Sequence, residues 1–246
     1  MNSDPVSLNM QDKAYVLHSR PYKNTSMIIE VLTHEHGRMT LVAKGAKRAG
    51  SPFQGCLELF TPIFIAWGGR SEMKTLYKAE TISGPNNLKG DLIFTGFYLN
   101  ELIMYLLHKH EAHVALFNAY QDCLNNLQAG EDTELVLRYF ELSLLNELGY
   151  GVSLDHELQT GEPVQADKQY AYNMETGISS VTSSDSAVLN ISGDTLLALS
   201  AGEISTERQK SEAKRLLRSI LEYHLEGRPI KTRELFAQKK KFPLSQ

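Results

Sequence analysis

The sequence predicts an α+β fold, in which an N-terminal five-stranded β-barrel precedes a mainly helical domain. Three observations support this prediction. Five short apolar or alternating segments fill the first 82 residues, and turn-forming residues separate them. Residues 83–87, Ser-Gly-Pro-Asn-Asn, then break the pattern. From residue 88 onward apolar side chains recur at helical spacing, so we expect two domains, at residues 1–82 and 83–246.

The five predicted strands span residues 14–18, 27–33, 38–44, 56–67 and 73–82. The turns between them are predicted at residues 20–22, 34–37, 50–52 and 68–70. Five short strands in this length of chain fit a small barrel of the OB type. An SH3-like barrel would also fit, because strand periodicity does not separate the two. Pro62 indicates a bend or an edge position, since proline has no amide hydrogen for the sheet.

Three helices are predicted next, at residues 88–109, 112–127 and 133–148. Asp132 is well placed to cap the third helix and Gly149 to end it. Residues 151–192 lose the helical period, with short strands expected at residues 169–173 and 177–182. We therefore expect a small irregular or β excursion from the helical domain. The last helices are predicted at residues 194–200, 205–226 and 232–238.

The composition is typical of a globular protein, with 42% apolar and 22% charged residues. The polar N-terminus lacks the apolar stretch of a secretory signal, and the most apolar helical stretch, residues 99–107, is too short to span a bilayer. Cys56 and Cys123 are the only cysteines, which favours reduced thiols over a disulfide framework. We therefore expect a cytoplasmic protein with no membrane partner.

Charge is distributed unevenly, although the net charge is only −4. Residues 1–80 hold ten Lys/Arg and seven Asp/Glu, residues 81–207 hold four and eighteen, and residues 208–246 hold eleven and four. Both ends of the chain are therefore basic and the middle is acidic. If the ends meet in the fold, they would form one basic face on an acidic body.

The first candidate site is the basic rim of the predicted barrel, where cations could neutralise phosphates and release counterions. Its residues are Arg20, Lys23, Arg38, Lys44, Lys47 and Arg48. Aromatic side chains on which bases could stack lie between and after these cations. They are Tyr15, Tyr22, Phe53, Trp67 and Tyr77. For an aromatic residue on an apolar strand, such as Trp67, a place in the core is the more common alternative.

A second basic group lies on the helix predicted at residues 205–226, and consists of Lys210, Lys214, Arg215 and Arg218. Three of these cations recur every four residues, so they share one helix face. They could extend a DNA track that begins on the barrel. Alternatively, they could offset the acidic middle of the chain by intramolecular pairing.

Three stretches of the sequence carry a family resemblance. They read YVLHSRPY at residues 15–22 with VAKGA at 42–46, then LRYFELSLL at 137–145, then LEGRPIKTREL at 225–235. In this order they resemble the family of the bacterial recombination mediator RecO. The resemblance implies an OB-fold domain and a helical domain that bind single- and double-stranded DNA and anneal complementary strands. It also implies contact with the acidic tail of the single-stranded DNA-binding protein (SSB), work with RecR to load RecA, and a place near the nucleoid.

The sequence departs from many members of that family at the zinc module. Those members carry four cysteines after the central helix, whereas residues 151–192 contain none, and Asp155 and His156 cannot replace such a set. We therefore expect the zinc-free branch of the family, with residues 151–192 held by ordinary packing. Neither a metal nor a cofactor is predicted, because the histidines elsewhere lack metal-site spacing.

A third candidate site surrounds Arg138. The resemblance implies an SSB tail that ends in acidic residues and a Phe carboxylate, which needs a cation beside an apolar pocket. Arg138 is the only arginine between Arg70 and Arg208. Its expected partners in such a pocket are Leu135, Tyr139 and Leu142. The alternative is an ion pair within the helix, to Glu134 or Glu141.

The resulting expectation is a non-enzymatic DNA-binding mediator of recombinational repair. One alternative is an OB-type RNA-binding or ribosome-associated module, which would prefer structured RNA over DNA. A metal-dependent nuclease is the enzymatic alternative, but no convincing cluster of carboxylates lies on the basic domain.

Overall fold

The computed structural model describes residues 10–71, 73–84, 88–151, 153–181 and 189–241. Contacts divide these residues into two units. The first contains the described residues up to Gln128 together with those from Ile230 onward, and the second runs from Ala129 to Pro229. The boundary predicted at residues 83–87 lies partly outside the described residues, and the division at residue 82 stays a prediction.

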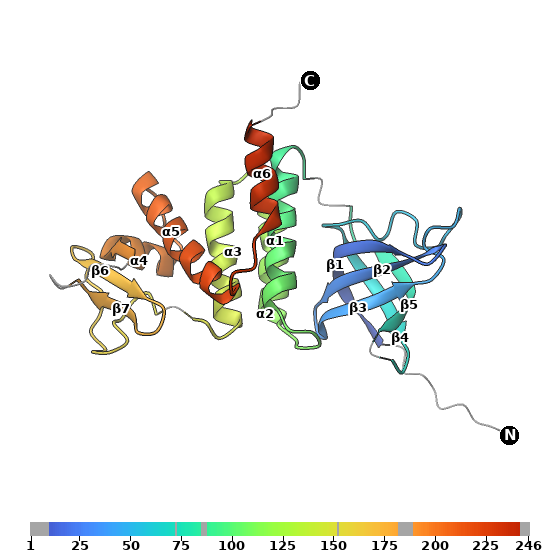
Figure 1. The fold of residues 1–246 in the computed structure, drawn as a ribbon, viewed down its shortest axis with the longest axis horizontal. Helices are drawn as coiled ribbons and strands as arrows, with labels where there is room; N and C mark the ends of the chain where they lie inside the picture. The colour runs from blue at the N-terminus through green and yellow to red at the C-terminus, as the bar shows by residue number, and fades with distance from the viewer. Residues whose placement is uncertain (1–9, 72, 85–87, 152, 182–188, 242–246) are drawn as a thin grey trace. The chain divides into compact units, whose positions relative to one another are not determined.

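The first unit contains a closed five-stranded barrel, coloured blue to cyan in Figure 1. Its strands are β1 (Met10–Tyr22), β2 (Ser26–Thr33), β3 (Gly37–Ala43), β4 (Pro62–Gly68) and β5 (Lys74–Thr81). They follow the order β1-β2-β3-β5-β4, and β4 pairs again with β1. The β3–β5 pair is parallel and the others are antiparallel. This arrangement confirms the predicted fold class, an OB-type barrel followed by helices and a small sheet.

The barrel interior is filled by the alternating apolar residues of its strands, as the period of two predicts. Val16, Ile29, Leu41, Ile63 and Trp67 are among the buried members of one continuous cluster. This cluster fixes the register, because a shift by one residue would turn the apolar side chains outward.

The largest differences from the predicted strand boundaries are at both ends of β1, which spans residues 10–22, and at the start of β4. The turn predicted at residues 20–22 is absent, because β1 continues to Tyr22, where Pro21 pairs with Met27. Proline is tolerated there because β4 pairs only with the first half of β1, as far as Tyr15. The strand predicted at residues 56–67 begins only at Pro62, where a missing amide hydrogen costs least.

Three helices complete the first unit: α1 (Asp91–Leu106), α2 (Val114–Ala129) and α6 (Lys231–Lys241). Buried Asn100 of α1 donates to the carbonyl of Leu17 in β1 at 2.8 Å and accepts from the hydroxyl of Tyr120 in α2 at 2.6 Å. On the same helix, the Glu101 carboxylate accepts from the backbone amides of Lys231 and Thr232, each at 2.9 Å. These bonds fasten α1 to the barrel and the start of α6 to α1.

The second unit contains α3 (Thr133–Glu147), β6 (Gln169–Asn173), β7 (Gly177–Ser180), β8 (Leu189–Ser192), α4 (Gly193–Ala201) and α5 (Glu207–His224). Asp132 caps α3 as predicted, because its side chain accepts from the amides of Glu134 and Leu135. The excursion is more regular than expected, since β8 joins β6 and β7 in an antiparallel sheet of order β7-β6-β8.

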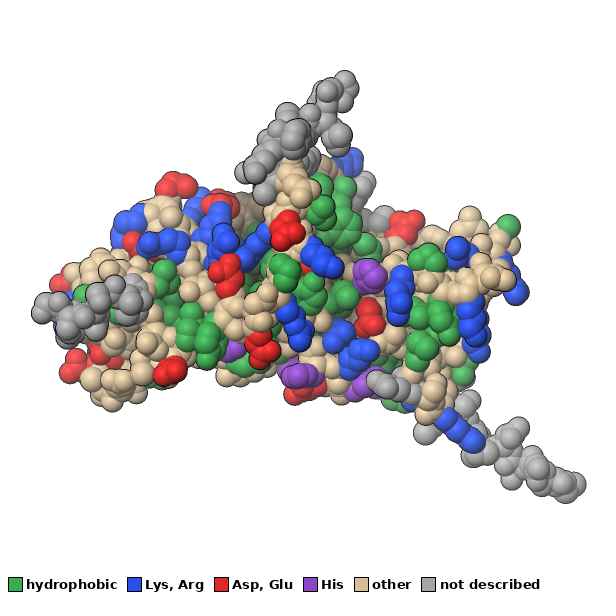
Figure 2. Space-filling model, in the orientation of Figure 1, with side chains coloured by type: hydrophobic (Ala, Val, Ile, Leu, Met, Phe, Trp, Pro, Cys, Tyr) green, Lys and Arg blue, Asp and Glu red, His purple; other side chains and the backbone are tan. Residues whose placement is uncertain are grey.

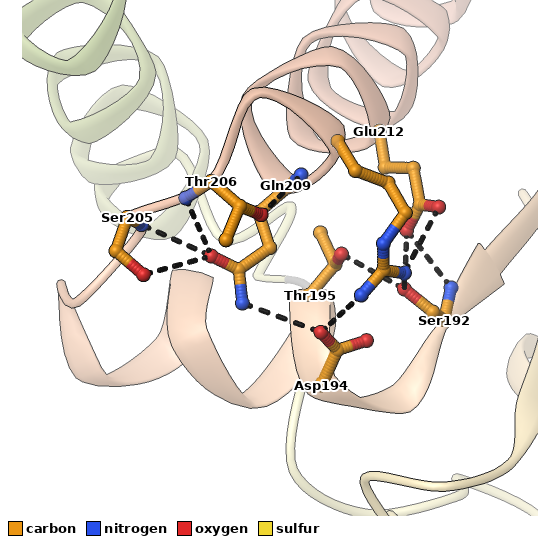
Figure 3. Close-up of polar contacts among 8 residues, drawn as sticks. Ser192, Asp194, Thr195, Ser205, Thr206, Gln209 and Glu212 are labelled. Atoms are coloured by element: carbon orange, nitrogen blue, oxygen red, sulfur yellow. Dashed lines mark hydrogen bonds and ion pairs between the residues drawn. The ribbon is translucent and has the colours of Figure 1, made fainter.

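Polar side chains join the end of β8 to the starts of α4 and α5 (Figure 3). The Arg208 guanidinium donates to Ser192 and forms an ion pair with Asp194. The Glu212 carboxylate accepts from the Ser192 amide at 3.1 Å and from its hydroxyl at 2.5 Å. Thr206 and Gln209 form a capping box at the start of α5. The excursion is therefore anchored through hydrogen bonds to α5.

Candidate nucleic-acid interface

One end of the barrel gathers cations from two loops. The β1–β2 turn carries Lys23, and the segment after β3 carries Lys44, Lys47 and Arg48. The Lys47 amide donates to the carbonyl of Thr25 at 2.9 Å, so the two loops are in direct contact. Arg20 lies on the same end of β1, because it pairs with Ile28, which in turn pairs with Val42. We call these five residues the basic tip: Arg20, Lys23, Lys44, Lys47 and Arg48.

The cations of the basic tip are exposed, and within the described part of the chain none of them forms an ion pair. The Lys23 ammonium forms a cation–π contact, 5.3 Å from the centre of the Tyr22 ring. No acidic residue occurs between positions 36 and 57. On the face drawn in Figure 2, Lys and Arg side chains lie along the barrel with few acidic ones among them. Unpaired cations this close together create a positive local potential despite the net negative charge.

Arg38 is not part of the basic tip, although the sequence analysis grouped it with those cations. It lies near the opposite end of β3, where its guanidinium contacts the Glu30 carboxylate at 3.2 Å and donates to the Leu107 carbonyl at 3.1 Å. Its side chain is mostly buried, so Arg38 joins the barrel to the end of α1.

The candidate aromatic residues separate into buried and exposed ones. Tyr15, Phe53 and Trp67 are buried in the unit, as the core alternative predicts. Burial, with the Asp122 charge as the smaller cause, raises the pKa of Tyr15 to about 12. Tyr77 differs from them because 47% of it is exposed, although it lies on strand β5.

The predicted cations of α5 all have partners within the second unit. Lys210 contacts Asp132 at 2.7 Å and Glu207 at 2.9 Å, and Lys214 contacts Glu134 at 2.7 Å. Arg215 donates to the carbonyl of Asn190, and Arg218 contacts Glu222. This geometry agrees with the intramolecular alternative. A role of these four side chains in DNA binding stays a prediction.

The pairs between α5 and α3 are reflected in shifted pKa values. The hydrogen bond from Lys210 lowers the pKa of Asp132, and the bond from Lys214 lowers the pKa of Glu134. Asp132 in turn raises the pKa of Lys210. Both carboxylates lie at the start of α3, where the positive end of the helix dipole also favours negative charge.

Arg138 is buried and paired within its own helix. Its Nη2 atom lies 2.7 Å from Oε1 of Glu141, and the side chains of the two residues are 7% and 1% exposed. Leu135, Tyr139 and Leu142 lie at successive turns of α3, and all three are half-buried. The Arg138 guanidinium is therefore already paired with Glu141, and little of its side chain is exposed to a partner.

Neither a metal-binding group nor a membrane-spanning helix is found among the described residues. No group of three or more His, Cys, Asp or Glu within them could hold a metal ion. No helix among them is long and apolar enough to span a bilayer.

Comparisons with known proteins agree with this architecture. Residues 7–85 match the family described as "Recombination protein O N terminal", and residues 90–234 match "Recombination protein O C terminal". A protein of Nitrosospira multiformis named DNA repair protein RecO is 42% identical over 97% of this chain and 98% of its own. Proteins of the same name from Methylococcus capsulatus and an Azoarcus species are 43% and 41% identical. The match to the Methylococcus protein covers 92% of this chain and 92% of that protein. The match to the Azoarcus protein covers 93% of this chain and 95% of that protein.

Proposed function

The chain belongs to the RecO family of DNA repair proteins, and from this premise we propose that it binds DNA without catalysis. The proposed ligands are single- and double-stranded DNA, held by their phosphates on the basic tip. The observation that carries the proposal is the set of five exposed cations at one end of the barrel, none of which forms an ion pair with a residue that the structure describes.

Charge neutralisation gives these cations a mechanism. Each phosphate held by Lys or Arg releases condensed counterions, which favours binding at low salt. Two complementary strands repel each other through their phosphates. A protein that neutralises part of this charge on both strands lowers the repulsion, so we propose that the protein promotes strand annealing.

The proposal extends to protein partners. Contact with the SSB tail would bring the protein to coated single strands, and RecR would complete the loading of RecA. For the tail we propose the surface of α3 around Arg138, Leu135, Tyr139 and Leu142. The half-buried apolar residues would accept the terminal Phe ring, and the tail carboxylate would replace Glu141 beside Arg138.

Annealing of SSB-coated oligonucleotides tests the proposal. The variant Lys44→Glu/Lys47→Glu/Arg48→Glu reverses three cations of the basic tip. We expect wild-type protein to accelerate annealing and the variant to lose at least about tenfold of that acceleration, because three phosphate contacts become repulsive.

A second triple variant, Lys89→Glu/Lys168→Glu/Arg228→Glu, serves as the matched control. It changes the net charge by the same amount at exposed positions outside the barrel, and we expect it to anneal like wild type. Equal losses in the two variants would refute a localised site. A wild-type protein that binds structured RNA more tightly than DNA would favour the RNA-binding alternative instead.

A further inference from the structure

A hollow of about 410 Å³ lies beside the basic tip, between strand β5 and the segment that links β3 to β4. Its lining includes Pro52, Phe53, Cys56, Tyr77, Lys78 and Glu80. Phe53 is buried in the barrel core, so this wall is fixed, whereas Tyr77 is 47% exposed. Among the described residues, the Tyr77 ring forms no ring–ring contact.

A β-bulge explains why Tyr77 faces outward. On strand β4, Ala66 pairs with Lys78 and the next residue, Trp67, pairs with Leu76. Tyr77 is therefore the extra residue of the bulge and has no partner on β4. Bulges redirect a side chain and are frequent beside functional sites.

The register of the neighbouring strand brings a basic residue to the same end of the sheet as this ring. Strands β3 and β5 are parallel, and their last pair is Ala43 with Leu76. The next residues along the two chains are Lys44 and Tyr77, so this register brings the backbone of Lys44 to the end of the sheet at which Tyr77 lies. Neighbouring strands are about 4.8 Å apart, well within the span of one nucleotide.

Charge is divided between the hollow and the basic tip. Within the hollow the Lys78 ammonium and the Glu80 carboxylate form a pair at 2.8 Å, so this surface is close to neutral. The adjoining residues 44–48 carry three cations and no acid. A phosphate is therefore favoured at the loop, while a neutral aromatic group is favoured in the hollow.

We propose that the hollow accepts one unpaired nucleobase, stacked on the Tyr77 ring, while Lys44 and its neighbours hold the adjoining phosphates. This inference rests on the proposed function, and adds a means of distinguishing single strands from duplex. In a duplex the bases are paired and stacked on one another, so duplex DNA reaches only the cations. The polar edge of a base could also donate to Glu80.

Binding of fluorescent oligonucleotides to the full chain tests this site. We expect Tyr77→Ala to weaken binding of a single strand about 5- to 150-fold, the range for loss of one stacked base. Duplex affinity should stay within about twofold of wild type, and the dependence of affinity on salt should not change, because no phosphate contact is lost. Tyr77→Phe should bind like wild type, since it keeps the ring.

An abasic strand of the same length provides the decisive comparison. Because it offers phosphates without bases, Tyr77→Ala and wild type should bind it equally. Tyr223→Ala, at an exposed tyrosine of α5, controls for loss of a surface ring. Unchanged single-strand affinity in Tyr77→Ala would overturn the inference, as would an equal loss on the abasic strand, which indicates a structural effect.

The two proposals fail in different ways. A wild-type protein that binds no DNA at all overturns both. A wild-type protein that binds single strands with strong salt dependence, but as tightly as its Tyr77→Ala variant, overturns only the base site.

Discussion

At the scale of single residues, the partner of each charge decides its role. Lys44 and Lys210 look alike in the sequence, since both lie in basic runs. In the fold, Lys44 has no ion partner among the described residues, whereas Lys210 contacts two carboxylates. One of these, Asp132, is 78 residues away in the chain. Sequence patterns identify the cations, but tertiary contacts decide which of them remain available to phosphates.

The Arg138–Glu141 pair leads to a prediction about stability. Removing one member of a buried ion pair leaves the other charge without compensation, at a cost of about 3–5 kcal/mol. We expect Arg138→Ala to lower the free energy of unfolding in urea by that amount. The double variant Arg138→Met/Glu141→Leu should be close to wild type, because both charges are replaced by apolar groups of similar size.

This pair of variants also separates stability from partner binding. The double variant lacks the cation but should keep the fold. Its affinity for an SSB tail peptide, compared with that of wild type, therefore measures what Arg138 contributes to binding. Unfolding curves that coincide for wild type and Arg138→Ala would contradict the structural role. Unchanged peptide affinity in the double variant would remove Arg138 from the proposed tail site.

At the scale of elements, helix ends could be predicted well and strand ends less well. The cap of α3 at Asp132 is a local feature, readable from residues that are adjacent in sequence. The bulge at Tyr77 depends on pairing with β4 and leaves no mark in the alternation of β5 itself. Strand β8 escaped prediction because its four residues carry too little pattern, and only pairing with β6 defines it.

The hydrogen-bonded carboxylates of Asp194 in α4 and Glu212 in α5 predict a dependence of stability on pH. Burial would raise the pKa values of Asp194 and Glu212, but hydrogen bonds outweigh it, and both are lowered from 3.8 and 4.5. The donors include Ser192 for both carboxylates, and Arg208 for Asp194. As the pH falls, these groups take up protons in the unfolded chain first. Their contribution to stability is therefore complete above about pH 4.5, and is lost as the pH falls through the folded-state values.

Thermal unfolding measured between pH 7 and pH 3 tests this dependence. We expect a steady loss of stability below about pH 4.5 in wild type. Glu212→Gln should start from lower stability at pH 7 and lose less on acidification, because one titrating group is gone. Parallel curves for the two proteins would show that Glu212 contributes nothing to the effect.

At the scale of the whole molecule, the cations fall into an unpaired group on the barrel and a paired group on α5. The net charge of −4 would repel DNA if it were spread evenly. The cations of the basic tip instead form no ion pair among the described residues, while Lys210 and Lys214 of α5 pair with acids of the second unit. The sequence left open whether the two basic ends share one surface or the C-terminal cations pair with acids of the chain, and the contacts of Lys210 and Lys214 agree with pairing.

The excursion at residues 151–192 is held by packing and by hydrogen bonds to α5. Residues 151–192 contain no cysteine. The sheet formed by β6, β7 and β8 buries Tyr170, Ile178 and Ile191, and the polar contacts of Figure 3 fasten it to α5. These contacts could not be predicted from the sequence, because they join residues distant in the chain, such as Ser192 and Glu212.

The salt dependence of single-strand affinity tests the central claim, that the cations of the basic tip hold phosphates. For single strands, the slope of log affinity against log salt changes by about 0.7 for each phosphate contact. The variant Lys44→Glu/Lys47→Glu/Arg48→Glu should therefore bind more weakly, with a slope shallower by about 2, while the Lys89/Lys168/Arg228 control keeps the wild-type slope. A slope and an affinity equal to those of wild type in the basic-tip variant would contradict the account.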